Sequence, residues 1–185
     1  MEIEKIYIDG PLIIKPKVFT DSRGYFFESF SAQLFEAIGV NANFVQDNQS
    51  LSQKGTVRGL HFQADPHAQG KLVRVVQGAV LDVAVDIRIG SPTYGKHFDI
   101  ELTGDNKTMF WVPPGFAHGF STLENNTIFL YKCTNLYHKA SEGGIHWNDP
   151  GLNIDWKVDE AIVSEKDQLL PSLDRFESPF TYESK

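Results

Sequence analysis

The segment 80–88 has the alternation that most constrains how this chain can fold. One face of an extended strand there would carry only large apolar side chains, namely Leu81, Val83, Val85 and Ile87. The opposite face would mix small apolar and charged side chains, namely Val80, Asp82, Ala84, Asp86 and Arg88. A period of two predicts a β-strand whose faces meet different surroundings.

Four further segments, 71–77, 97–102, 108–112 and 127–134, also read as short strands. Turn-forming runs separate them: Gly90-Ser-Pro, Gly104-Asp-Asn, Pro113-Pro-Gly and Glu124-Asn-Asn. Closely spaced strands favour a sandwich or barrel over alternating β-α units. We therefore expect an all-β jelly-roll barrel with a few short helices. One helix is predicted over 31–38, with Ser31 as N-cap and Gly39 after its end, and a second begins near Ser164.

Composition limits the class of protein. The 185 residues fit one domain, 1–185, and 41% of them are hydrophobic. The net charge of −7 and the lack of a basic stripe argue against a nucleic-acid partner. No signal peptide or membrane-spanning stretch is visible, so a cytoplasmic location is expected by default. Cys133 is the single cysteine, and its apolar neighbours predict a packed thiol rather than a nucleophile.

Two motifs resemble the paired motifs of the cupin superfamily. Gly55 is followed after five residues by His61, and Pro113-Pro-Gly115-Phe-Ala-His118 matches P-x-G-x-x-H. The resemblance implies that the expected jelly-roll barrel is of the cupin type. Metal-binding cupins carry a second histidine where this chain has Gln63, and a glutamate where it has Lys71. Lysine is a cation without a lone pair at neutral pH, so it replaces the charge of a metal instead of binding one. We expect no metal and no other cofactor.

An ammonium beside an imidazole suits proton abstraction next to a ketone. The imidazole removes the carbon-bound proton, and the ammonium stabilises the developing enolate oxygen. An epimerase also needs a proton donor on the other face of the sugar. Tyr131 is a candidate, although its apolar neighbours also fit a core aromatic side chain.

A longer series of segments resembles the dTDP-4-dehydrorhamnose 3,5-epimerase family. In the order of that family, the segments are 21–28, 44–50, 58–63, 68–71, 83–88, 113–120, 131–134, 144–150 and 164–167. The resemblance covers roughly residues 18 to 170. It implies epimerisation of dTDP-4-dehydro-6-deoxy-D-glucose at carbons 3 and 5, giving dTDP-4-dehydro-L-rhamnose for dTDP-rhamnose biosynthesis.

The resemblance also implies residue roles. His61 matches the catalytic base, Asp167 the carboxylate that orients it, Tyr131 the proton donor and Lys71 the residue beside the enolate oxygen. The positions that match residues holding the nucleotide, diphosphate or sugar are Arg23, Glu28, Gln46, Asn48, Arg58, His118, Glu142 and Lys166. In this family the segment 23–28 enters the neighbouring subunit's site, which implies a homodimer.

Several alternatives stay open. Arg23 and Arg58 also fit ordinary surface charges, and the segment 164–167 also reads as a capping box that opens a helix. Competing functions are a single-centre epimerase, a 3,4-ketoisomerase, a metal-dependent cupin enzyme and a non-catalytic sugar-binding cupin. The retention of His61, Lys71, Tyr131 and Asp167 together argues against the last of these.

Overall fold

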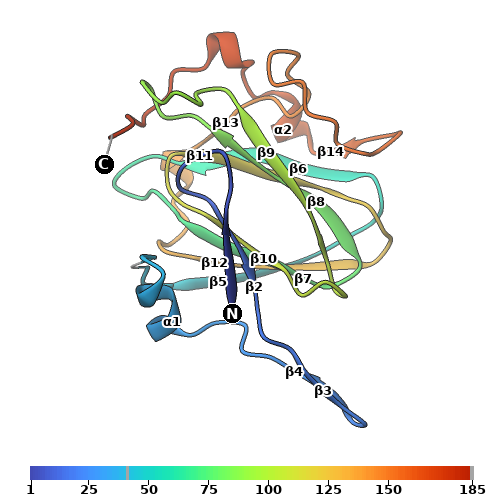
Figure 1. Ribbon diagram of the computed structural model, residues 1–185. Coiled ribbons are helices and arrows are strands. Elements are labelled where there is room, and N and C mark those ends of the chain that lie inside the picture. The colour runs from blue at the N-terminus through green and yellow to red at the C-terminus, as the bar shows by residue number, and fades with distance from the viewer. Residues whose placement is uncertain (41, 184–185) are drawn as a thin grey trace.

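A computed structural model describes residues 1–40 and 42–183, which form two facing six-stranded sheets (Figure 1). The first sheet has the order β1 (Glu2–Lys5), β2 (Leu12–Lys15), β10 (Met109–Val112), β7 (Lys71–Gln77), β12 (Thr127–Cys133), β5 (Gln46–Ser52). The second has the order β13 (Glu142–Gly144), β6 (Thr56–Gln63), β11 (Phe116–Thr122), β8 (Ala79–Asp86), β9 (His97–Thr103), with β14 (Ile162–Val163) parallel to β6. This is the jelly-roll barrel expected from the strand pattern.

Helices are few and short. They are α1 (Ala32–Ala37), α2 (Glu165–Gln168) and the 3-10 turns η1 (Lys139–Ser141) and η2 (Leu173–Arg175). Ser31 is the N-cap of α1, but its side chain makes no capping hydrogen bond. Ser164 caps α2 and accepts a hydrogen bond from the Asp167 N–H, so the capping motif is confirmed there. None of the helices in the described part of the chain is long and apolar enough to cross a membrane.

Three apolar clusters hold the layers together. The first lies between the sheets and joins residues such as Val73 and Phe129 of one sheet to Ala84 and Phe120 of the other. In the second, the C-terminal segment covers the outer face of the second sheet, and in the third α1 covers part of the first sheet. Strand β8 is buried along its whole length because its two faces belong to different clusters.

The predicted strands are confirmed with small shifts at their ends. The strand expected over 71–77 is β7, and those expected over 97–102, 108–112 and 127–134 are β9, β10 and β12. The strand expected over 80–88 is β8, but it ends at Asp86. Arg88 therefore lies beyond the strand, where its side chain turns back to bond Asp86.

A bulge in β6 decides which side chains enter the barrel. His61 pairs with His118 and Arg58 with Phe120, so three steps along β6 match two along β11. Without the extra residue, Arg58 and His61 would face opposite sides of the sheet, yet both line the interior cavity. At the bulge Gly59 has φ of +127°, and a Cβ there would lie 2.6 Å from Gly119 Cα. Only glycine fits this close approach of the two strands.

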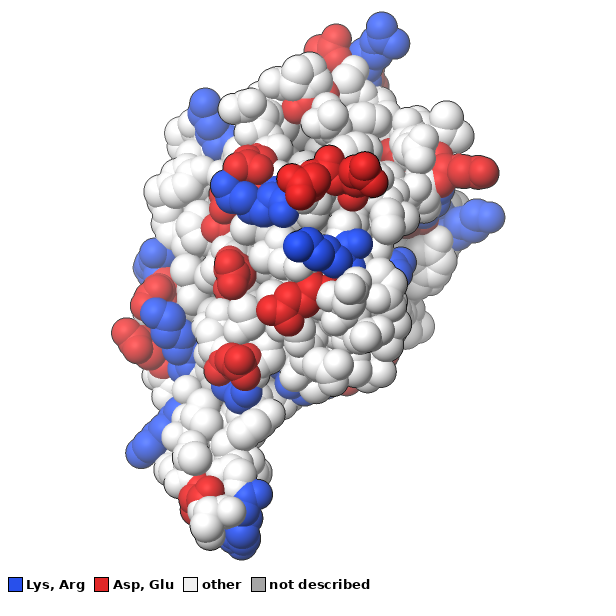
Figure 2. All heavy atoms as spheres, turned by 90° about the vertical axis from the view of Figure 1, so that its right-hand side faces the viewer, with Lys and Arg blue, Asp and Glu red and all other residues white. Residues whose placement is uncertain are grey.

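A hairpin formed by β3 (Phe19–Asp21) and β4 (Gly24–Phe26) projects away from the barrel (Figure 1). Phe19, Tyr25 and Phe26 on it are 54%, 56% and 68% exposed. Seen from the side, this arm ends in charges of both signs (Figure 2). Large apolar side chains on a projecting arm are typical of a contact with another chain.

Candidate active site

The interior of the barrel holds a cavity of about 490 Å³. His61 and His118 line it from the second sheet, and Lys71 and Tyr131 line it from the first. A second recess of about 350 Å³ is lined by His61, Lys71 and Tyr131 as well, and it extends to Glu142. The two recesses therefore share the side chains expected to carry the chemistry.

His61 lies against a buried carboxylate. Its Nε2 is 2.7 Å from Oδ1 of Asp167, and the Gly59 N–H donates to Oδ2 at 3.3 Å. Burial alone would raise the pKa of Asp167, but hydrogen bonds from His61, Gly59 and Ser164, the N-cap of α2, hold it below its ordinary value. The ionised carboxylate fixes the His61 ring and leaves Nδ1 as the nitrogen available to a ligand.

Lys71 begins β7 and is only partly exposed. Burial lowers the pKa of its ammonium, and the negative charges of Asp82 and Glu142, together with Cys133, oppose that change. Its cross-strand partners are Cys133 on β12 and Val112 on β10. The predicted packing of Cys133 is confirmed, because the thiol is fully buried and burial raises its pKa.

Tyr131 faces the cavity from the middle of β12. Burial raises the pKa of its phenol, Cys133 and Glu142 raise it further, and Arg58 opposes them. The phenol is therefore protonated near neutrality and able to donate a proton. The ring lies beside Phe129, which stacks on Phe120 with ring centroids 4.3 Å apart and makes one wall apolar.

The expected binding residues Gln46, Asn48, Glu142 and Lys166 form a polar rim. Lys166 Nζ lies 2.5 Å from Glu142 Oε2, to which the Tyr137 hydroxyl donates at 2.9 Å. Gln46 accepts from the Tyr137 N–H and donates to Asn48. Tyr137 thus links both halves of the rim, although its side chain is 54% exposed.

Arg58 on β6 also lines the cavity, from the second sheet. Its Nε and one terminal nitrogen both donate to Ser52 Oγ at 3.2 Å. This leaves the rest of the guanidinium fork available for anionic oxygens.

Gln63 has a structural role at the position where metal-binding cupins have histidine. Its Nε2 donates to the carbonyls of His67 and Leu136, and its Oε1 accepts from the His138 N–H. These three bonds occupy the amide. Within residues 1–40 and 42–183, no three His, Cys, Asp or Glu side chains cluster so as to hold a metal ion.

Two expected binding residues lie outside the cavity. Arg23 is on the projecting hairpin, where its side chain is 87% exposed and pairs with Asp21 at 2.6 Å. Glu28, just after the hairpin, is exposed too. Neither lines the recesses that hold the other expected residues.

Sequence reasoning missed several polar residues at or beside the two recesses, among them Tyr137, Ser50 and Asp82. Ser50 lines the cavity, and its buried hydroxyl has no hydrogen-bond partner within residues 1–40 and 42–183. Asp82 is fully buried and holds His118, with its two oxygens 2.9 and 3.0 Å from Nε2. The signal for Asp82 was in the sequence, because a carboxylate inside an apolar strand needs a partner.

Comparison with known proteins agrees with this geometry. Residues 5–175 match the model of the family described as dTDP-4-dehydrorhamnose 3,5-epimerase. The chain belongs to this family. As a member of the dTDP-4-dehydrorhamnose 3,5-epimerase family, it is an isomerase with the family's jelly-roll fold.

Individual relatives are similar over nearly the whole chain. The dTDP-4-dehydrorhamnose 3,5-epimerase of Shigella flexneri is 52% identical, with 90% of this chain and 93% of the relative covered. A crystal structure of the epimerase from Legionella pneumophila, in complex with dTDP-4-keto-L-rhamnose, is 47% identical and superposes with a TM-score of 0.95, covering 99% of both chains. A dTDP-4-dehydrorhamnose 3-epimerase of Streptomyces niveus is 37% identical, covering 91% of this chain and 82% of its own.

Proposed function

We propose that this protein epimerises dTDP-4-dehydro-6-deoxy-D-glucose at carbons 3 and 5, through an enolate and without a metal ion. The observation that supports this most directly is the placement of His61 and Tyr131 on opposite sheets of one cavity. Inversion at a carbon requires that a proton leave one face and arrive at the other. A base and an acid on facing walls can do this without turning the sugar over.

His61 is the base. Its Nε2 is held by Asp167, so the ring presents Nδ1 to the substrate and the carboxylate stabilises the imidazolium that forms when a proton is taken. The carbonyl at carbon 4 makes the hydrogens on carbons 3 and 5 acidic. Removal of either one gives an enolate at the same oxygen.

Lys71 stabilises that oxygen. Its ammonium lies in a partly buried cavity, where a charge acts more strongly on a developing anion than it would in water. Tyr131 then delivers a proton from the opposite wall. Burial keeps its phenol protonated, so its role is to donate.

The remaining residues hold the substrate. Arg58 and Lys166 offer cationic groups to the diphosphate, and Gln46, Asn48, His118 and Glu142 offer polar groups to the sugar and base. We also propose a homodimer in which Arg23 and Glu28 complete the partner's site. The exposed apolar hairpin supports this arrangement. Within each subunit we infer one domain, 1–185, because both sheets share one core.

The test is to incubate the protein with dTDP-4-keto-6-deoxyglucose in heavy water and to locate the deuterium. Label at carbons 3 and 5 with inversion at both supports the proposal, whereas label at one carbon identifies a single-centre epimerase and no label contradicts the mechanism. His61→Asn should lose both exchange and inversion. Tyr131→Phe should still take up deuterium, but from the His61 side and with retained configuration. The exchange rate of His61→Asn and the inversion rate of Tyr131→Phe should each fall about 100- to 10,000-fold.

A further inference from the structure

Asp82 is a buried charge for which the mechanism above has no use. It lies in the middle of β8, on the face that also carries Val80 and Ala84 of the core between the sheets. Its side chain is 0% exposed. An unpaired carboxylate in such surroundings is strongly destabilising, because burial removes the water that solvates its charge. A charge at this position therefore needs partners of the opposite sign or strong hydrogen-bond donors.

One partner is His118. The Nε2 atom of His118 lies 2.9 and 3.0 Å from the two oxygens of Asp82, so the ring donates there. This leaves Nδ1 as the ring nitrogen available to a ligand in the cavity that His118 lines. His118 is also the cross-strand partner of His61. Two imidazoles thus stand side by side in the cavity, each tied through Nε2 to its own carboxylate.

The cation on which the charge of Asp82 acts is Lys71, on the opposite sheet. The charged and titratable groups around it are Asp82 from β8, Glu142 from β13, Arg58 and His61 from β6, His118 from β11, Tyr131 and Cys133 from β12, and Lys166 and Asp167 from α2. Glu142 already pairs with Lys166. Asp167 is held by His61. Of the two carboxylates whose charge raises the pKa of Lys71, Asp82 is the one with no lysine or arginine bonded to it among the described residues.

We propose that Asp82 is a positioning residue of the enolate-binding end of the cavity: it holds His118 and supplies the negative charge opposite Lys71. This rests on the proposed function, since it assumes that Lys71 faces an enolate oxygen. The carboxylate does not touch the substrate. It acts by fixing the ring of His118 and by keeping Lys71 cationic in a site where burial favours the neutral amine.

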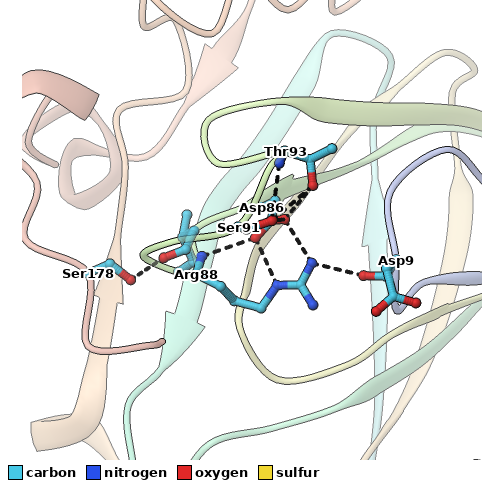
Figure 3. A network of polar contacts seen from close by, with 7 residues as sticks. Asp9, Asp86, Arg88, Ser91, Thr93 and Ser178 are labelled. Carbon is cyan, nitrogen blue, oxygen red and sulfur yellow. Dashed lines mark hydrogen bonds and ion pairs between the residues drawn. The ribbon is translucent and has the colours of Figure 1, made fainter. Parts of the chain in front are cut away.

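The chain offers a matched control. Asp86 lies four residues further on, on the same face of β8, is equally buried and bonds Arg88, Ser91 and Thr93 outside the cavity (Figure 3). Asp82→Asn and Asp86→Asn both remove one buried charge from the same strand. Only Asp82→Asn is expected to change the rate of exchange and its pH dependence.

The experiment follows deuterium uptake from heavy water into dTDP-4-keto-6-deoxyglucose as a function of pH, together with kcat and KM. Exchange is the better readout because it requires His61 and Lys71 but not proton delivery by Tyr131. Asp82→Asn should lower kcat about 10- to 100-fold with KM within about 3-fold, as is typical when the support of a functional group is lost. The fall in the exchange rate at alkaline pH, the alkaline limb of the pH–rate profile, should begin at lower pH in this variant. The reason is that the pKa of Lys71 falls when its counter-charge is lost. Asp86→Asn should keep the wild-type rate and limb.

The proposal would be overturned if Asp82→Asn kept the wild-type rate and the wild-type alkaline limb. It would also be overturned if the rate fell but the limb did not move, which is the behaviour of a purely structural residue. The same shift of the limb in Asp86→Asn would overturn it as well. If Asp82→Asn does not fold, Asp82→Glu keeps the charge and should keep the wild-type limb, and a shifted limb would overturn the proposal. If the wild-type protein itself catalyses no exchange, the proposed function has failed, and that result is distinct from all of these.

Discussion

The Nε2 atom of His61 lies 2.7 Å from Oδ1 of Asp167, although 106 residues separate the two in the chain. The contact exists because β14 pairs with β6 and places the start of α2 beside the bulge at Gly59. The base and the group that orients it are thus built from distant segments.

Asp167→Asn should lower epimerisation and exchange about 100- to 10,000-fold, because an amide cannot stabilise the imidazolium and favours the wrong tautomer of His61. Initial rates with the dTDP-keto sugar measure the effect. Glu165→Gln is the matched control, since Glu165 lies on the same short helix but is exposed. Equal rates in the two variants would contradict the role of Asp167.

Ser50→Ala should raise KM about 2- to 10-fold, the worth of one hydrogen bond, with little change in kcat. Ser50 lines the cavity, and its buried hydroxyl has no partner in the part of the chain that the structure describes, so a ligand could supply one. Thr122→Val is the control. The buried hydroxyl of Thr122 likewise has no partner among the described residues, but Thr122 does not line the cavity. A KM that rises equally in both variants would show that Ser50 makes no special contact.

Prolonged chelation should leave the activity unchanged, because Lys71 supplies the positive charge that a metal would bring and the Gln63 amide is fully hydrogen-bonded. Elemental analysis and rates before and after chelation measure this. Stoichiometric zinc, iron or manganese whose removal abolishes turnover would refute the metal-free mechanism.

Arg23→Ala should weaken nucleotide binding, and a mixture of Arg23→Ala and His61→Ala chains should regain activity. In a mixed dimer one of the two sites has both native residues, so random exchange restores about a quarter of the wild-type rate. Titration calorimetry and activity after subunit exchange measure the two effects. Light scattering that finds a fully active monomer would exclude the shared site.

Asp86→Asn should destabilise the fold by about 2 to 4 kcal/mol at pH 7, because it breaks a buried ion-pair network. Asp86 receives bonds from Arg88, Ser91 and Thr93, and Arg88 also donates to the Asp9 carbonyl, which ties the N-terminal segment to the barrel (Figure 3).

We also expect the effect of Asp86→Asn on the free energy of unfolding to depend on pH. Burial alone would raise the pKa of Asp86, but its hydrogen bonds hold it below the model-compound value of 3.8. Its stabilisation is therefore fully present above that value and is lost as the pH falls through the lower pKa of the folded state. Urea unfolding should thus show a gap between wild type and Asp86→Asn that is wide near neutrality and narrows in acid. A gap that widens in acid would contradict this sign.

The sequence by itself determined the strands and the chemical type of the site. The alternation in 80–88 and the turns around it are local signals, and β8 follows them to within two residues at its end. The motifs around His61 and His118 likewise indicated an acid-base site with a lysine in place of a metal ligand. These signals can be read from the sequence because strand period and side-chain chemistry depend on residues that are close together in the chain.

Only the tertiary structure decided how these residues meet. Simple alternation would put Arg58 and His61 on opposite faces, and the bulge at Gly59 brings both inside. The pairing of Asp82 with His118, the hydrogen-bonded Gln63 and the exposed position of Arg23 were equally outside the reach of local patterns. The physical reason is that strand register and contacts between distant segments are set by which surfaces pack together, and no window of neighbouring residues contains that information.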